Sequence, residues 1–148
     1  MQTFNDIASL RAEIHRQRLA GQRIAFVPTM GNLHAGHIKL VTEGLRHADR
    51  VVSSVFVNPT QFGPGEDFDN YPRTLPRDQE QLSAAGCHYL FAPPVEEMYP
   101  GDQAQWAKVV VTDITDRHCG AARPGHFDGV STVVSKLFNI VKPDLALF

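Results

Sequence analysis

Two histidines three residues apart mark the segment FVPTMGNLHAGH at positions 26–37 as a place where chemistry could occur. At the start of a helix, His34 and His37 would share one face, so each ring could donate a hydrogen bond to a phosphate oxygen. Gly31 allows a ligand to approach the backbone closely, and Gly36 keeps the first helical turn narrow. Because free N–H groups at a helix N-terminus attract anions, the segment predicts a phosphate-binding turn.

The two histidines also have other readings. His34 could cap the helix while His37 packs on the surface, which is the usual situation of an isolated histidine. A zinc ion could take both rings, with His126 or Cys119 as a third ligand. Zinc fits the spacing poorly, because zinc-binding histidines on helices prefer positions i and i+4 beside an acid. We therefore favour phosphate binding and predict no metal site.

A second polar segment, FVNPTQF at 56–62, follows an apolar run directly. Asn58 and Gln61 place neutral donor and acceptor groups between aromatic rings, which suits a small substrate with a carboxylate or hydroxyl and apolar parts. Asn-Pro is also a common start of a turn, so the segment alone could be only a connection.

Two further stretches carry polar residues. In RPGHFDGVSTVVSKLFNIVKPD at 123–144, packing explains the apolar helix but not Arg123 and His126, which precede it. YPRT adds Tyr71, which belongs either to the site or to an exposed loop.

Apolar patterning gives the elements that must position these residues. Strands are expected at 24–27, 50–57, 88–92, 108–112 and 145–148, and helices from Asn5 or Asp6 to Gly21, from 34 or 35 to 48, at 76–85 and at 129–141. Strands alternating with helices predict an α/β fold with a Rossmann-like parallel sheet and helices on both faces. Ligands of such sheets bind at the carboxyl ends of the strands, at the topological switch point, where the segment 26–37 would lie.

Composition narrows the class further. A chain of 148 residues is long enough for one domain with a sizeable core. A net charge of −2 gives no general attraction for nucleic acid. The two cysteines lie far apart, which favours a reducing compartment, and no apolar run has the length of a membrane span. We expect a cytoplasmic protein that binds neither nucleic acid nor membrane.

The motifs PTMGNLHAGH, VFVNPTQF, YPRTL and RPGHFDGVSTVVSKLFNIVKPD, in this order, closely resemble the pantoate–β-alanine ligase (pantothenate synthetase) family over essentially the whole chain. The H-x-G-H element alone is shared with the wider nucleotidyltransferase superfamily. The resemblance implies a ligase of pantothenate biosynthesis. Pantoate would attack the α-phosphate of ATP, brought in with Mg²⁺, and β-alanine would then attack pantoyl adenylate to give pantothenate and AMP.

The resemblance also implies site residues. His34 and His37 would be catalytic, with His37 the proton donor, and Asp78 is a weak candidate for the neighbourhood of Mg²⁺. The ATP-binding residues would be Met30, Gly31, Asn32, Leu33, His34, Ala35, Gly36 and His37. The residues that bind pantoate or β-alanine would be Gln61, Pro28, Met30, Asn58, Val130 and Phe148, with Tyr71, Arg123 and His126 as further candidates.

Family members are longer and continue with a G-x-K-D-x-Q-Q segment and an S-S-R-N loop in a second, lid domain. Residues 1–148 are therefore expected to be the N-terminal ATP- and pantoate-binding domain, with little ligase activity alone. A homodimer is expected, with its contact at the strand RVVSSVFV (50–57). Two alternatives stay open. One is another H-x-G-H nucleotidyltransferase, although a phosphorylated acceptor would favour Arg or Lys where Asn58 and Gln61 stand. The other is a non-catalytic domain that binds nucleotide or dimerises.

Overall fold

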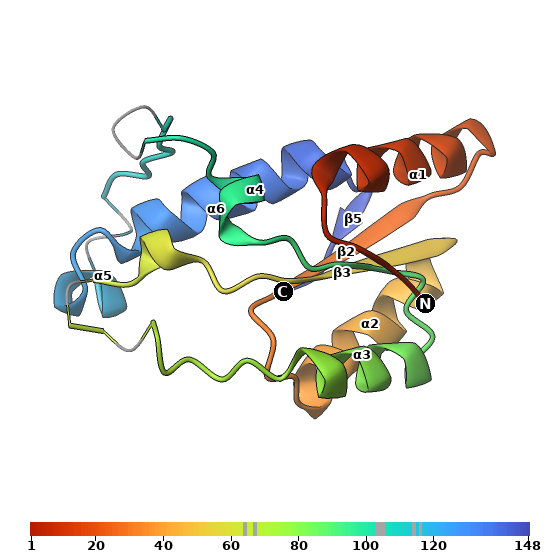
Figure 1. The fold of residues 1–148 in the computed structure, drawn as a ribbon, viewed down its shortest axis with the longest axis horizontal. Coiled ribbons are helices and arrows are strands. Elements are labelled where there is room, and N and C mark those ends of the chain that lie inside the picture. Colours follow the sequence, from red (N-terminus) through yellow and green to blue (C-terminus); the bar gives the residue numbers. More distant parts are fainter. Residues whose placement is uncertain (64, 67, 103–105, 114, 116) are drawn as a thin grey trace.

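The computed structural model describes residues 1–63, 65–66, 68–102, 106–113, 115 and 117–148. Within these ranges five strands form one sheet in the order β1-β4-β3-β2-β5, and every pairing is parallel. The expected parallel α/β sheet is therefore confirmed (Figure 1). The strands are β1 (Gln2–Phe4), β2 (Ile24–Thr29), β3 (Arg50–Val55), β4 (Tyr89–Phe91) and β5 (Leu145–Ala146).

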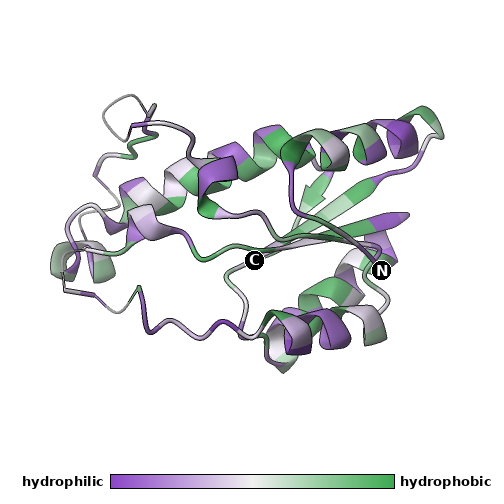
Figure 2. Ribbon diagram, viewed as in Figure 1, coloured by the Kyte–Doolittle hydropathy of each residue, from purple (hydrophilic) through white to green (hydrophobic). Residues whose placement is uncertain are grey.

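Helices cover both faces of this sheet (Figure 1). Ile24 and Phe26 of β2 pack toward α1 and α6, whereas Ala25 and Val27 pack toward α2 and α3. A parallel sheet covered on both faces needs strands that are apolar throughout, and the strands in the middle of the fold are mostly green in Figure 2. The long helices are α1 (Ile7–Leu19), α2 (Ala35–His47), α3 (Leu75–Ala84) and α6 (His126–Val141), and the short ones are η1 (Pro59–Gln61), α4 (Val95–Met98) and α5 (Cys119–Ala122).

Helix α1 shows how local signals set the boundaries. Asp6 is the N-cap, and its carboxylate accepts a hydrogen bond from the Ser9 backbone N–H at 2.8 Å. Gly21 follows the helix with a φ of 76°, which favours glycine. Both ends agree with the sequence prediction.

The switch point of the sheet lies between β2 and β5. From β2 the chain moves to β3 and then β4 on one side, whereas β5 pairs with the other side of β2. The turn that follows β2 and the residues that follow β5 therefore meet at the carboxyl edge where ligands bind in such sheets. The predicted position of the segment 26–37 is confirmed.

The strand expected at 108–112 is wrong. Val109 to Val111 are exposed and pair with no strand among the described residues; the Val109 N–H instead donates to Thr132 Oγ1 of α6 at 2.9 Å. The Ser131 hydroxyl donates to the Val109 carbonyl. The backbone of Val109 therefore bonds to side chains of α6 rather than to a sheet partner.

Other boundaries also differ. The sheet has an unexpected edge strand, β1, which pairs with β4. Helix α6 begins at His126 rather than at residue 129, and β3 and β5 end at Val55 and Ala146, before the expected 57 and 148. The dimer contact expected at 50–57 stays a prediction; residues 51–54 of this stretch are buried between β2 and β4. Pro64 and Asp67, between η1 and α3, lie outside the described residues.

Candidate functional site

The chain turns sharply where β2 ends. Gly31 and Asn32 both adopt left-handed backbone conformations, with φ values of 82° and 50°. The hydroxyl of Thr29 donates to the Ser54 carbonyl at 2.6 Å and accepts from the Gly31 N–H at 3.2 Å. Two successive left-handed residues explain why a glycine stands in this turn, as its sequence suggested.

Asp78 of α3 fixes this turn. Its fully buried carboxylate accepts hydrogen bonds from the backbone N–H of Leu33 at 2.9 Å and of Asn32 at 3.1 Å, and from the Thr74 hydroxyl at 3.0 Å. A Cβ at Gly31 would lie 3.0 Å from Oδ2 of Asp78, so a side chain there would crowd the carboxylate. Sequence reasoning considered Asp78 only as a neighbour of Mg²⁺ and missed this contact.

His34 and His37 lie together at the start of α2, with ring centroids 4.1 Å apart. His34 is the N-cap, and its Nδ1 accepts from the Gly36 N–H at 3.1 Å. Nδ1 of His37 accepts from the His34 backbone N–H at 3.3 Å. Because Nδ1 is an acceptor in both rings, each neutral imidazole carries its proton on Nε2. Capping and phosphate binding are therefore compatible roles, since the cap uses one nitrogen and the other remains a donor.

Burial lowers the pKa of His37 below its ordinary value, the neighbouring His34 lowers it further, and the Asp78 carboxylate opposes both effects. A lowered pKa keeps the ring neutral at pH 7. His37 then retains the tautomer whose Nε2–H can donate to an anion.

Gln61 at the end of η1 reaches the same region. Its side-chain Nε2 lies 3.0 Å from the Met30 sulfur, and its Oε1 accepts from Asn58 Nδ2 at 3.1 Å. Asn58 is only 1% exposed and also donates to the Gly129 carbonyl of α6 at 3.1 Å. A Cβ at Gly129 would lie 2.4 Å from the Thr60 carbonyl oxygen, so only glycine permits this close packing of α6 on η1.

The remaining predicted pocket residues lie on the elements that meet at the switch point. Pro28 is in β2, and Val130 is a partly buried residue of α6. Phe148, after β5, is 73% exposed and its ring lies 6.2 Å from that of Phe138 in α6. Tyr71 packs edge-on against Phe62 at 5.9 Å, and burial raises the pKa of its hydroxyl.

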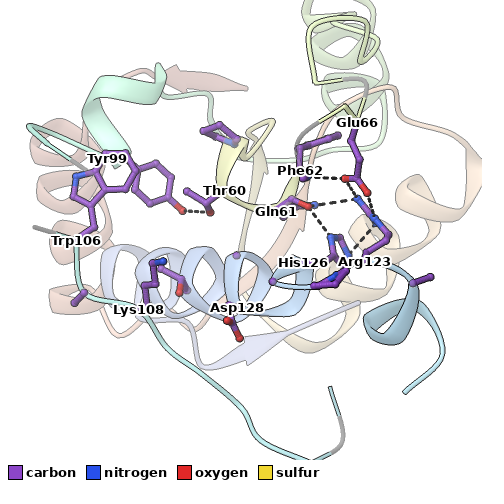
Figure 3. A pocket seen from close by; sticks show the side chains of 18 residues that line it. Thr60, Gln61, Phe62, Glu66, Tyr99, Trp106, Lys108, Arg123, His126 and Asp128 are labelled. Atoms are coloured by element: carbon purple, nitrogen blue, oxygen red, sulfur yellow. Dashed lines mark hydrogen bonds and ion pairs between the residues drawn. The ribbon is translucent and has the colours of Figure 1, made fainter. Parts of the chain in front are cut away.

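Arg123 and His126 form a network next to Gln61 (Figure 3). The guanidinium of Arg123 binds both carboxylate oxygens of Glu66 at 2.6 Å. These bonds, together with the Gly63 N–H, lower the pKa of Glu66 to about 2. Glu66 is a second residue that sequence reasoning missed, since an acid in a polar loop gives no signal of its partner.

One cavity lies beside Gln61 and Arg123, and another lies beside the turn that follows β2. A cavity of about 650 Å³ lies beside Gln61 and is bordered by Lys108, Arg123 and Asp128, and none of residues 30–37 lines it. A smaller one of about 250 Å³ touches Met30, Gly31 and Asp78. Gln61 lines the larger cavity and also contacts Met30, so it lies between that cavity and the turn at residues 30–37, which we call the histidine turn. Over the described ranges, no three His, Cys, Asp or Glu residues are grouped to hold a metal ion, and no helix is long and apolar enough to cross a membrane.

Known proteins share both the sequence and the fold. The chain is 64% identical over 148 residues to pantothenate synthetase from Stutzerimonas stutzeri (strain A1501), covering 100% of this chain and 52% of that relative. It superposes with a TM-score of 0.92 on pantothenate synthetase from Thermus thermophilus, at 50% identity, covering 100% of this chain and 51% of the other. Pantoate-beta-alanine ligase from Francisella tularensis, complexed with beta-gamma ATP and beta-alanine, gives a TM-score of 0.90 at 37% identity, over 99% of this chain and 55% of that one.

The chain spans about half the length of the curated relatives it matches. Its likeness to these proteins covers essentially the whole chain and includes the Rossmann-like α/β fold. The family model for pantoate-beta-alanine ligase matches residues 2–148, and the chain therefore belongs to this family.

Proposed function

We propose that this chain is the ATP- and pantoate-binding half of a pantoate–β-alanine ligase. The observation that carries the proposal is the pair of histidines at the start of α2, at the switch point of the sheet, each with Nε2 as its proton-bearing nitrogen. Gln61 supports it, because its side chain lies against Met30, the first residue of the proposed ATP-binding segment.

The proposed reaction needs no nucleophile from the protein. A carboxylate oxygen of pantoate attacks the α-phosphorus of ATP, the bond to pyrophosphate breaks, and pantoyl adenylate forms. The neutral amine of β-alanine then attacks the acyl carbon, the bond from that carbon to the AMP oxygen breaks, and the amine's proton passes to solvent, leaving pantothenate and AMP. Catalysis therefore rests on orienting the reactants and on stabilising charge at the phosphates.

The chain's residues divide these tasks. Met30 to His37 would bind ATP, with the Nε2–H groups of His34 and His37 donating hydrogen bonds to its phosphates. The proton-donor role expected for His37 would then be hydrogen-bond donation from its neutral ring to the leaving pyrophosphate. Gln61 would bind the polar groups of pantoate and lie near β-alanine. The apolar part of pantoate would contact Pro28, Met30, Val130 and Phe148, with Asn58 and Tyr71 close by.

Mg²⁺ would enter as part of the ATP substrate. Asp78 does not fit a role as its ligand, because its fully buried carboxylate already accepts two backbone N–H groups and a hydroxyl. The metal would therefore be held through the phosphates rather than by this residue.

A homodimer in the cytoplasm is part of the proposal. Because residues 51–54 are buried, the contact would use the partly exposed ends of this stretch or other residues, among which Val109 to Val111 expose apolar side chains. Sedimentation at increasing concentration measures the association; a monomer at every concentration contradicts a dimer of this chain.

Titration calorimetry tests the ligands. We expect ATP–Mg²⁺ and pantoate each to bind the chain, His37→Ala to weaken ATP at least tenfold, and Gln61→Ala to weaken pantoate while ATP affinity stays within twofold. Absence of binding by either ligand would overturn the proposal. A phosphorylated acceptor that displaces pantoate would point instead to another nucleotidyltransferase, which the neutral, buried Asn58 disfavours.

A further inference from the structure

The backbone carbonyl of Gln61 is held by two side chains that precede or begin α6. His126 Nδ1 lies 2.8 Å from this oxygen, and Arg123 Nη2 donates to it at 3.4 Å. Gln61 is the last residue of η1, where a helix leaves its carbonyl groups without partners inside the helix. The two side chains therefore satisfy a backbone group that the local fold cannot satisfy.

Arg123 is itself fixed by an acid. Its Nε and Nη2 donate to the two oxygens of Glu66 at 2.6 Å, and Glu66 also accepts from the Gly63 N–H at 3.0 Å. A two-pronged bond between guanidinium and carboxylate restricts the orientation of both groups. The ion pair thus ties the segment before α6 to the loop after η1 (Figure 3).

His126 links Arg123 to the Gln61 carbonyl in a chain of hydrogen bonds whose donors and acceptors match. Its Nδ1 must carry a proton to bond the Gln61 carbonyl, so Nε2 of the neutral ring is an acceptor. Arg123 Nη1 lies 3.3 Å from that Nε2 and donates a hydrogen bond to it. The order is therefore Glu66, Arg123, His126 and the Gln61 carbonyl, with each donor matched to an acceptor.

The side chain of Gln61 is held by a different set of groups. Asn58 donates to its Oε1, and its Nε2 faces the Met30 sulfur. Arg123 and His126 bond the backbone of Gln61 instead. Without direct contact between them and a ligand, their effect on a ligand of the Gln61 side chain passes through Gln61 itself.

We infer that Arg123 and His126 are positioning residues that set the backbone of Gln61, and through it the direction of the amide that receives pantoate. This inference rests on the proposed function, in which Gln61 binds pantoate. Glu66 belongs to the same unit, because it orients Arg123. This inference gives a role to Arg123 and His126, the two motif residues that packing does not explain.

The first test uses the 148-residue chain with the variants His126→Ala and His126→Asn. Asparagine can place its amide N–H near the position of Nδ1, whereas alanine removes the donor. We expect alanine to weaken pantoate binding about tenfold and asparagine to restore most of the loss, with ATP–Mg²⁺ affinity unchanged within twofold in both. Wild-type pantoate affinity in His126→Ala would overturn the inference, as would failure of asparagine to restore it.

A second variant, Glu66→Gln, loosens Arg123 without touching Gln61, and we expect a severalfold loss of pantoate affinity. Its matched control is Glu43→Gln, which removes the acid from an ion pair with Arg46 on α2 and should leave both ligands unaffected. Equal effects of the two substitutions would contradict the inference. Glu66→Gln also keeps the inference testable should His126→Ala fail to fold.

Nuclear magnetic resonance separates the inference from the proposed function. The side-chain amide signals of Gln61, assigned by their loss in Gln61→Ala, should shift in His126→Ala and Glu66→Gln but not in Glu43→Gln, without any ligand. If these signals do not move, positioning fails even if pantoate binds. If they move but Gln61→Ala binds pantoate as the wild type does, the proposed function fails and the positioning stands.

Discussion

The carboxylate of Asp78 accepts a hydrogen bond from the backbone N–H of Leu33 at 2.9 Å, across 45 residues of sequence. The same carboxylate binds the N–H of Asn32, which has a left-handed backbone conformation. Helix α3 therefore stabilises the turn that delivers His34 and His37 to the start of α2. The geometry of the histidine pair thus depends on a residue that need not touch any substrate.

Replacing Asp78 by asparagine should lower both stability and ATP affinity. The amide has one acceptor oxygen where the carboxylate has two, so at least one of its three donors loses its partner. We expect the free energy of unfolding to fall by about 1.5–3 kcal/mol, the range for hydrogen bonds to charged groups. Denaturant unfolding and ATP calorimetry measure the two effects. Glu80→Gln, an exposed acid of the same helix, is the control and should change neither quantity.

His34 offers a way to separate capping from ligand binding. His34→Ala removes the acceptor for the Gly36 N–H and should cost about 0.5–2 kcal/mol of stability, whereas His34→Asn supplies a favoured N-cap and should recover most of it. Neither variant keeps the Nε2–H donor, so both should bind ATP more weakly. If His34→Asn were stable and bound ATP as tightly as the wild type, His34 would be a cap only.

The titration of His37 should have its midpoint below the ordinary value of 6.5. Because the folded pKa lies below the unfolded one, the unfolded chain takes up its proton first as pH falls. The contribution of His37 to the free energy of unfolding should therefore be constant above about pH 6.5. It should decrease as the pH falls from about 6.5 toward the folded pKa. Imidazole proton resonances give the midpoint, and unfolding curves of His37→Gln should lack this part of the pH dependence. A midpoint at or above 6.5 would contradict the burial argument.

Glu66 should respond to acid in a lower pH range. Its pKa is about 2 in the folded chain against an ordinary 4.5, because it accepts hydrogen bonds from Arg123. The stability that this pair contributes is present above pH 4.5 and is lost as pH falls from 4.5 toward 2. Comparing unfolding of the wild type and Glu66→Gln at about pH 6 and about pH 2.5 checks this, since the difference between them should shrink at the lower pH.

The histidine turn was predictable because its signals are local. Proline, glycine and a helix cap each restrict the backbone within a few residues, so the turn and the start of α2 could be read directly. The valines at 109–111 show the limit of such reading, because a β-branched run has the same pattern whether or not a strand partner exists. The edge strand β1 was not predicted, because a strand of three residues has too short a pattern to be recognised in the sequence.

The contacts of Asp78 and Glu66 could not be predicted from sequence. Both acids lie in polar stretches that are typical of solvent-exposed segments, and their partners Leu33 and Arg123 are 45 and 57 residues away. Only the packing of α3 beside the turn after β2, and of the loop between η1 and α3 beside α6, brings each pair together. Sequence therefore identified the residues expected to contact ligands, and the fold was needed to find those that hold them.

Gly129 gives the sharpest test of how α6 packs on η1. Glycine to alanine inside a helix normally gains about 1 kcal/mol, so propensity alone predicts that Gly129→Ala stabilises the chain. The added Cβ would instead lie 2.4 Å from the Thr60 carbonyl oxygen and 2.6 Å from the Gln61 backbone. Since both contacts are with backbone rather than with a flexible side chain, we expect a net loss of about 1–3 kcal/mol and weaker pantoate binding.

The control for this substitution is Gly44→Ala in α2, whose Cβ would meet only side chains, the nearest being Val51 at 3.3 Å. Denaturant unfolding should show a clearly smaller loss for Gly44→Ala, and its pantoate affinity should match the wild type. Stabilisation by Gly129→Ala would mean that η1 can move away from α6 at little cost. In that case the close packing of the two elements could not be what sets the position of Gln61, and the hydrogen bonds from Arg123 and His126 would have to hold it alone.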